Sequence, residues 1–187
     1  MSSYCFSTYS HDDACLVGGS DIDAFQYVMQ AGGITSEYLY PFVKSIKTCD
    51  KTKNKYLVTV AKINYLYSES EMVRHVMSKG TFTAIIDIDN ARYYKSGIFT
   101  GNCKTEYPQF GVNIVGVNLV ERYWIVQNSW GTQWGEGGYM KLGLVSKCTA
   151  STHIFSSSSR LNITHLIQRI TAGREHVRHR KPTWCFC

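Results

Sequence analysis

The chain has 187 residues, of which 44% are hydrophobic and 18% are charged. This composition is typical of a globular protein and argues against a disordered chain or a coiled coil. No apolar run approaches the roughly 20 residues that span a bilayer, and the start Met-Ser-Ser-Tyr-Cys-Phe has neither the basic beginning nor the apolar core of a signal peptide. We therefore expect no transmembrane segment.

The formal net charge of +6 is concentrated near the C-terminal end. From Ser156 onward the chain carries six Arg or Lys side chains and one Glu, so the body before it is nearly neutral. Electrostatic attraction therefore belongs to the tail, and one hypothesis is that the tail anchors the protein to an anionic surface. We expect no nucleic-acid partner. Because residues 156–187 show no sustained hydrophobic period, we predict a basic extension there that is disordered or weakly helical.

Seven cysteines are spread widely along the chain, and the only close pair is Cys185-Phe-Cys187 at the end. Such spacing favours disulfides in an oxidising compartment over a zinc site, so we predict no metal and no cofactor. Because the count is odd, at least one thiol has no partner within the chain.

The first part of the chain predicts helices. Ser20 can cap a helix whose apolar residues recur at helical spacing, and Gly32-Gly33 ends it; these residues are Ile22, Phe25, Val28 and Met29. After an alternating stretch at 56–67, which predicts a strand, Ser68-Glu-Ser-Glu71 forms a capping box. The second helix then runs through Met72, Val73, Val76 and Met77 to Gly80.

From Thr81 the pattern favours strands separated by short turns. The predicted strands are Thr81–Ile88, Tyr93–Thr100, Gly111–Asn118, Tyr123–Gln127 and Tyr139–Leu142. Such close spacing indicates an antiparallel sheet or a barrel-like lobe. A helix-bearing part followed by a β part is the layout of an α+β protein.

The most informative stretch connects the last two of these strands. It contains Asn128-Ser-Trp-Gly-Thr-Gln-Trp-Gly135, a polar turn crowded with tryptophan and glycine. Glycine permits tight turns and close backbone approach, and indole rings cover polar groups with an apolar face. By itself the segment also fits a β-hairpin with a glycine-rich turn.

This motif resembles the Asn-Ser-Trp-Gly segment of the papain-like (cathepsin-like) cysteine proteases. Further likenesses are Gly18-Gly19 before a helix, Tyr40-Pro41 and the cysteine set, and together they cover about residues 4–155. One departure is that two residues separate Cys15 from Gly18, where the family has Cys-Asn-Gly-Gly.

The resemblance implies an α+β, two-lobe papain-like domain over residues 1–155, of which the N-terminal part is missing. Residues 1–55 would be the remainder of the helical left lobe, and 56–155 mainly the antiparallel, barrel-like right lobe. The tail 156–187 lies outside the resemblance.

The resemblance also assigns catalytic positions. Family catalysis needs a thiolate nucleophile, a histidine that accepts its proton and a residue that orients that histidine. Asn128 matches the orienting residue, Trp130 and Trp134 match the tryptophans beside it, and Phe110 occupies the histidine position. No segment matches the nucleophile signature Cys-Gly-Ser/Ala-Cys-Trp/Tyr, which is expected about 130–150 residues upstream of the histidine and hence before Met1.

Phenylalanine cannot accept a proton, so we expect a catalytically inactive homologue that binds peptide or protein, a pseudoenzyme. The alternative is a fragment of a genuine cysteine endopeptidase. Two other histidines could be considered as the base, but His75 is predicted on the wet face of its helix and His153 beside the last strand. Neither is at the family position.

A binding cleft is the other implied feature. In the family, the residues after the glycine pair form one wall and pair with extended peptide. Here these are Gly18, Gly19 and Ser20, which would face Ile85 and Gly111. The family further implies a monomer in an extracellular or lysosomal compartment.

Disulfides are implied residue by residue. Cys5 should pair with Cys49, and Cys103 with Cys148. The family partner of Cys15 is absent from the chain, so Cys15 is the predicted unpaired thiol. The alternative is that all seven cysteines are reduced.

Overall fold

The computed structural model describes residues 21–35, 38–41, 52, 59–86, 89–101, 110–144 and 149–157. The chain divides into two compact units, one formed by Asn64–Ile154 and the other by the segments on either side of it. The segment Asn128–Gly135 and the strands on either side of it all lie in the Asn64–Ile154 unit.

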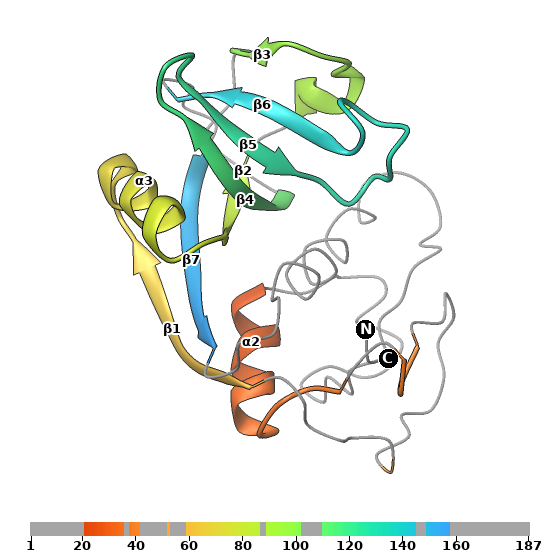
Figure 1. Ribbon diagram of the computed structural model, residues 1–187. Helices are drawn as coiled ribbons and strands as arrows, with labels where there is room; N and C mark the ends of the chain where they lie inside the picture. The colour runs from red at the N-terminus through yellow and green to blue at the C-terminus, as the bar shows by residue number, and fades with distance from the viewer. Residues whose placement is uncertain are drawn as a thin grey trace. The chain divides into compact units, whose positions relative to one another are not determined.

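A seven-stranded sheet organises the described chain, with the strand order β1-β7-β2-β4-β5-β6-β3 (Figure 1). Its strands are β1 (Val60–Leu66), β2 (Phe82–Ile86), β3 (Ile98–Phe99), β4 (Phe110–Asn118), β5 (Tyr123–Gln127), β6 (Tyr139–Gly143) and β7 (Thr149–Ser157). The pairs β2–β7, β2–β4, β4–β5 and β5–β6 are antiparallel, whereas β3 runs parallel to β6. The fold is therefore α+β with a mixed sheet, mostly antiparallel as predicted.

The strand register gathers the apolar side chains on one face, because alternate residues of a strand point to opposite faces. Phe82 pairs with Ile114, which in turn pairs with Val126, and Val126 pairs with Met140. All four side chains are almost completely buried. Burial of this apolar area is the main source of stability in the sheet unit.

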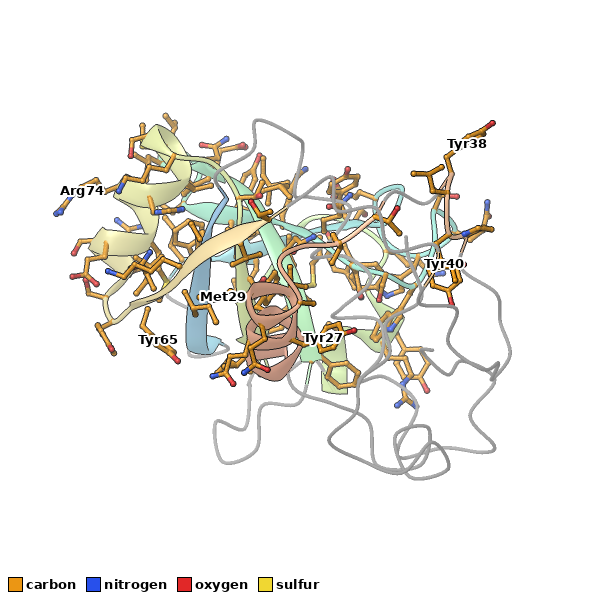
Figure 2. All side chains as sticks on the ribbon, turned by 90° about the horizontal axis from the view of Figure 1, so that it is seen from below. Tyr27, Met29, Tyr38, Tyr40, Tyr65 and Arg74 are labelled. Atoms are coloured by element: carbon orange, nitrogen blue, oxygen red, sulfur yellow. The ribbon has the colours of Figure 1, made fainter. Side chains whose placement is uncertain are left out.

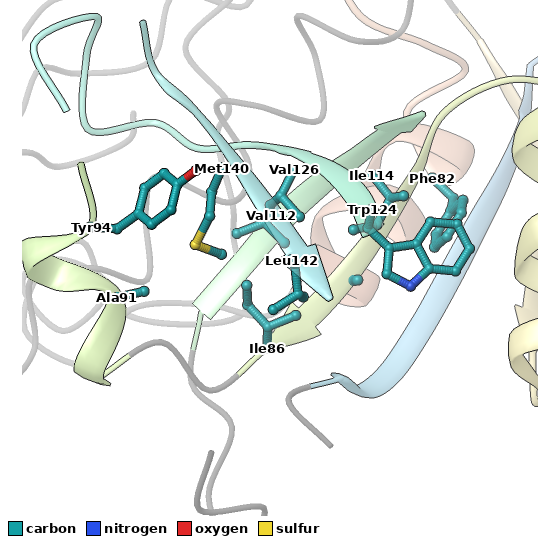
Figure 3. Close-up of a cluster of buried hydrophobic side chains, with 11 residues drawn as sticks. Phe82, Ile86, Ala91, Tyr94, Val112, Ile114, Trp124, Val126, Met140 and Leu142 are labelled. Carbon is teal, nitrogen blue, oxygen red and sulfur yellow. The ribbon is translucent and has the colours of Figure 1, made fainter. Parts of the chain in front are cut away.

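Figure 3 shows this core in close-up, with Trp124 beside Phe82 at one end and Tyr94 near Met140 at the other. The rings of Phe82 and Trp124 meet edge to face, with centroids 6.0 Å apart. Aromatic pairs in this geometry contribute about 0.5–1.5 kcal/mol beyond their buried area.

Helix α2 (Asp21–Gln30) lies where the first apolar stripe predicts a helix. Phe25 and Val28 are fully buried, whereas Met29 is 40% exposed. The buried stripe is therefore narrower than the sequence pattern suggests.

Helix α3 (Glu69–Ser78) begins at the predicted cap. The Glu71 N–H donates to Ser68 Oγ at 3.3 Å, and the Glu71 carboxylate accepts from the Tyr67 N–H at 2.9 Å. This is a capping box in which the returning carboxylate reaches one residue further than usual. The helix ends at Ser78 with Lys79 as its C-cap, and the predicted stop residue Gly80 follows with φ +109.

One face of α3 packs against the core through Met72, Val73 and Val76. Its opposite face is solvent-exposed, and Figure 2 shows Arg74 extending away from the helix. Met77, which the pattern placed on the apolar stripe, is 67% exposed.

One predicted strand is wrong, and one strand of the structure was not predicted. The stretch Tyr93–Thr100 is not one strand: the 3-10 helix η2 (Asp89–Tyr93) is followed by a turn, and only Ile98–Phe99 pairs. Tyr94 causes this, because its N–H donates to Ala91 O and its hydroxyl donates to Gly97 O at 2.7 Å. Strand β7 was not predicted, since its polar sequence has little hydrophobic alternation and its place is set by backbone pairing with β2.

We predict that Gly135→Ala destabilises the protein by more than about 2 kcal/mol, whereas Gly131→Ala costs only about 1–2 kcal/mol, the usual penalty of a left-handed residue. Both glycines have positive φ, but only at Gly135 would a Cβ collide with backbone, lying 2.5 Å from Tyr139 O. At Gly131 no atom lies within 4 Å. Urea unfolding measures both values, and equal losses would show that Gly135 is not tightly packed.

Candidate active site

The site lies where β4 begins and β5 ends. Asn113 pairs with Gln127, and Ile114 with Val126. If this antiparallel register is continued past the end of β5, it brings Trp130 opposite Phe110. The side chains confirm that these two residues lie opposite each other, because the Phe110 and Trp130 ring centroids are 5.8 Å apart.

Four rings form a continuous series here, which we call the aromatic wall: Phe110, Trp130, Trp134 and Tyr94. Phe110 meets Trp130 edge to face at an interplanar angle of 88°. Trp130 meets Trp134 in the same way, with centroids 5.0 Å apart, and Trp134 lies tilted against Tyr94 at 5.7 Å. The wall is therefore built from β4, the loop after β5 and the segment after η2.

Trp134 is oriented by hydrogen bonds as well as by ring contacts. Its Nε1 donates to Ala91 O at 3.3 Å and to Arg92 O at 3.2 Å, both carbonyls of η2. A partly buried indole N–H needs such partners, so η2 fixes the ring on which Trp130 rests.

Asn128 lies at the first position after β5 and is only 6% exposed. Its backbone N–H donates to Gly138 O at 3.0 Å, and its Oδ1 accepts from the Ser129 N–H at 2.7 Å. In the part of the chain that the structure describes, its Nδ2 is buried and has no hydrogen-bond partner. Leaving a buried donor unpaired costs about 1–3 kcal/mol.

The sequence-predicted residues are only partly brought together. Phe110, Trp130 and Trp134 are in contact, and Asn128 is on the same loop. The cleft residues Ile85 and Gly111 face each other as a β2–β4 pair, with Gly111 buried and Ile85 half-buried.

Other predicted residues lie outside the described ones. These are Gly18, Gly19 and Ser20 of the cleft, the cysteines Cys5, Cys15, Cys49, Cys103 and Cys148, and the tail beyond residue 157. Among the described residues, no group of three or more His, Cys, Asp or Glu side chains is arranged to hold a metal. No described helix is long and apolar enough to cross a membrane.

The expectation that His75 faces water is wrong. The imidazole is half-buried and lies edge to face against Phe82, with centroids 6.1 Å apart. Burial, and secondly the positive charge of Lys79, lower the pKa of His75 from its usual 6.5. His153 lies on β7, paired with Thr83. The ring contact of His75 is with Phe82, which is not one of the four rings of the aromatic wall.

Tyr94 is the site residue that sequence reasoning missed. It was assigned to a strand, yet it is 7% exposed and closes the aromatic wall. The available signal was the short spacing between Tyr94 and Gly97, which is typical of a turn and not of a continuing strand.

Comparison with known proteins agrees with this fold and site. The family model described as papain family cysteine protease matches residues 4–158. Because this covers most of the chain, the protein belongs to the papain family of cysteine proteases.

Individual relatives come from plants and animals. The chain is 35% identical over 139 residues to the cysteine endopeptidase Rep1 of Oryza sativa subsp. japonica, covering 70% of this chain and 37% of that one. It is 36% identical over 135 residues to procathepsin L of Felis catus, covering 67% of this chain and 41% of that one. The chain thus spans about two fifths of the length of these relatives.

Solved structures show the same fold. The bromelain protease from Ananas comosus in complex with the E64 inhibitor superposes with a TM-score of 0.65 at 28% identity, covering 74% of this chain and 70% of that one. Digestive procathepsin L2 proteinase from the larval midgut of Tenebrio molitor gives a TM-score of 0.67 at 30% identity, covering 74% of this chain and 47% of that one.

We predict that His75→Gln makes the protein less sensitive to mild acid. Because the pKa of His75 is lower in the folded state than in the unfolded state, the unfolded chain takes up its proton first as the pH falls. The wild type therefore loses stability as the pH falls from about 6.5 toward the folded pKa, and a glutamine removes that loss. Tm measured between pH 7.5 and 5 should fall less in the variant. Equal declines would contradict this role of His75.

Proposed function

We propose that this chain is a non-catalytic member of the papain family that binds extended peptide or protein segments. The observation that carries the proposal is Phe110. If the family correspondence holds at this residue, a ring without a lone pair occupies the place of the general base. Its edge-to-face contact with Trp130 at 5.8 Å supports this interpretation.

The chemistry explains why the substitution matters. In the family mechanism the histidine takes the proton of the cysteine and returns it to the leaving group. A carbon ring can do neither, and a thiol without a neighbouring imidazolium keeps a pKa near 8.5. General acid–base transfer alone contributes about 10²–10⁴-fold.

Asn128 supports the same proposal. Its family role is to accept a hydrogen bond from the histidine, yet here its Oδ1 accepts from the Ser129 N–H and its Nδ2 has no partner among the described residues. The Oδ1 that would accept from the family histidine is therefore bonded within its own loop, as expected if position 110 carries no imidazole donor.

Peptide binding does not need the base. Extended peptides add to a cleft mainly through backbone hydrogen bonds, and the β2–β4 pair Ile85–Gly111 remains part of a regular sheet. We propose that Gly18, Gly19 and Ser20 supply the opposite wall, that the protein acts as a monomer, and that it resides in an extracellular or lysosomal compartment. The names of its relatives, which include procathepsin L and a KDEL-tailed cysteine endopeptidase, support this location.

A second candidate is a portion of an active cysteine endopeptidase. The relatives favour it, since Rep1 and the KDEL-tailed CEP2 are both named cysteine endopeptidases. It requires another group to act as the base in place of Phe110.

We predict that the protein isolated from its native source does not react with a thiol-directed peptidyl probe and does not cleave a fluorogenic peptide. In a form whose own sequence includes a family nucleophile, Phe110→His should raise labelling by about 10²–10⁴-fold, the usual contribution of a general base.

Phe99→His is the matched control, because Phe99 is also a partly buried ring that packs against the core. It should leave labelling unchanged. Rapid labelling or turnover by the protein with Phe110 intact would overturn the proposal and favour the endopeptidase.

A further inference from the structure

The carboxylate of Glu136 lies in the loop between β5 and β6 and interacts with three other residues. Its Oε1 accepts from the Gly97 N–H at 2.9 Å and lies 3.0 Å from the Tyr94 hydroxyl. Its Oε2 lies 3.1 Å from Lys141 Nζ. One side chain thus joins the loop of the aromatic wall to the turn before β3 and to β6.

Tyr94 links this carboxylate to the aromatic wall. Its hydroxyl hydrogen is shared between Gly97 O and Glu136 Oε1, and the hydroxyl oxygen accepts from the Lys141 N–H at 3.3 Å. Its ring lies against Trp134. A continuous series of contacts therefore runs from Glu136 through Tyr94, Trp134 and Trp130 to Phe110.

We propose that Glu136 is the positioning residue of the aromatic wall. Its carboxylate holds the Tyr94 ring and the β5–β6 loop together, so that Trp134 and then Trp130 are kept against Phe110. This inference rests on the proposed function in one respect: it treats the aromatic wall as part of the peptide-binding site.

An exposed ion pair alone would not support this role, since such pairs contribute only about 0–1 kcal/mol. Glu136 differs because it also accepts a backbone N–H from another segment of the chain. The neighbouring residue gives independent support: a Cβ on Gly135 would lie 3.1 Å from the Tyr94 ring. The backbone of the β5–β6 loop is thus packed closely against the Tyr94 ring, whose hydroxyl bonds to Glu136.

The charges around Glu136 determine how pH acts on it. Hydrogen bonding from the Gly97 N–H, with Lys141 and Tyr94 contributing, lowers the pKa of Glu136 from its usual 4.5. Lys141 is cationic, with its pKa raised mainly by Glu136, and its Nζ lies 5.7 Å from the Tyr123 ring centroid. Burial raises the pKa of Tyr94, which stays neutral.

The sign of the pH dependence follows from linkage. A carboxyl group whose pKa is lower in the folded state stabilises that state above the unfolded pKa, and the effect is lost as the pH falls through the folded pKa. The aromatic wall should therefore stay assembled in mildly acidic solution and loosen only when the pH falls below about 4.5, the ordinary value for glutamate.

The test measures the near-ultraviolet circular dichroism of the full chain. The part of the spectrum that Trp130→Phe removes is assigned to the Trp130–Trp134 pair. Glu136→Leu should lose most of this signal at temperatures below unfolding. Glu136→Gln retains an oxygen acceptor for Gly97 and Tyr94, so it should retain the signal and lose its dependence on pH. Glu69→Leu, at an exposed acidic residue in the first turn of α3, should behave as the wild type.

Three outcomes would overturn the proposal. They are an unchanged signal in Glu136→Leu, a lost signal in Glu136→Gln, or the same acid transition in Glu136→Gln as in the wild type. If Glu136→Leu does not fold, the proposal is tested by comparing the pH dependence of the signal in the wild type with that in Glu136→Gln. Binding of capped hexapeptides is measured in parallel: if the signal behaves as expected and no peptide binds, the proposed function fails while the positioning role stands.

Discussion

The edge-to-face contact between Phe110 and Trp130 is the interaction on which the site depends. It joins the start of β4 to the loop after β5, two segments that the sheet register brings side by side. An aromatic pair of this kind adds about 0.5–1.5 kcal/mol beyond its buried area. In our proposal the contact also has a chemical consequence, because Phe110 would stand where the family has its catalytic histidine.

The residues around Phe110 are held by burial and by their own hydrogen bonds. Trp134 is still anchored by two carbonyls of η2, and Asn128 is still buried at the end of β5. Within the described segments, the Nδ2 of Asn128 is buried and has no hydrogen-bond partner. The buried core of the sheet, which includes Phe82 and Met140, packs against Phe110, Trp130 and Trp134.

Much of the fold and part of the candidate site could be predicted from the sequence, for physical reasons that differ between elements. The capping box at Ser68 and the strand Tyr123–Gln127 are local signals, and both are confirmed. Strand β7 could not be predicted, since backbone pairing with β2 outweighs its weak side-chain pattern. The packing of the half-buried His75 against Phe82 and of Tyr94 against Trp134 are tertiary contacts that helical or strand periodicity does not contain.

The central claim, that the protein holds a peptide without cleaving it, is tested most directly by native mass spectrometry. The protein is incubated with excess capped hexapeptides for many hours and the masses of complexes and free peptides are recorded. The account predicts complexes that contain intact peptide and no new fragments in solution. Peptide fragments that accumulate with time would contradict it, because they would require a base that Phe110 cannot supply.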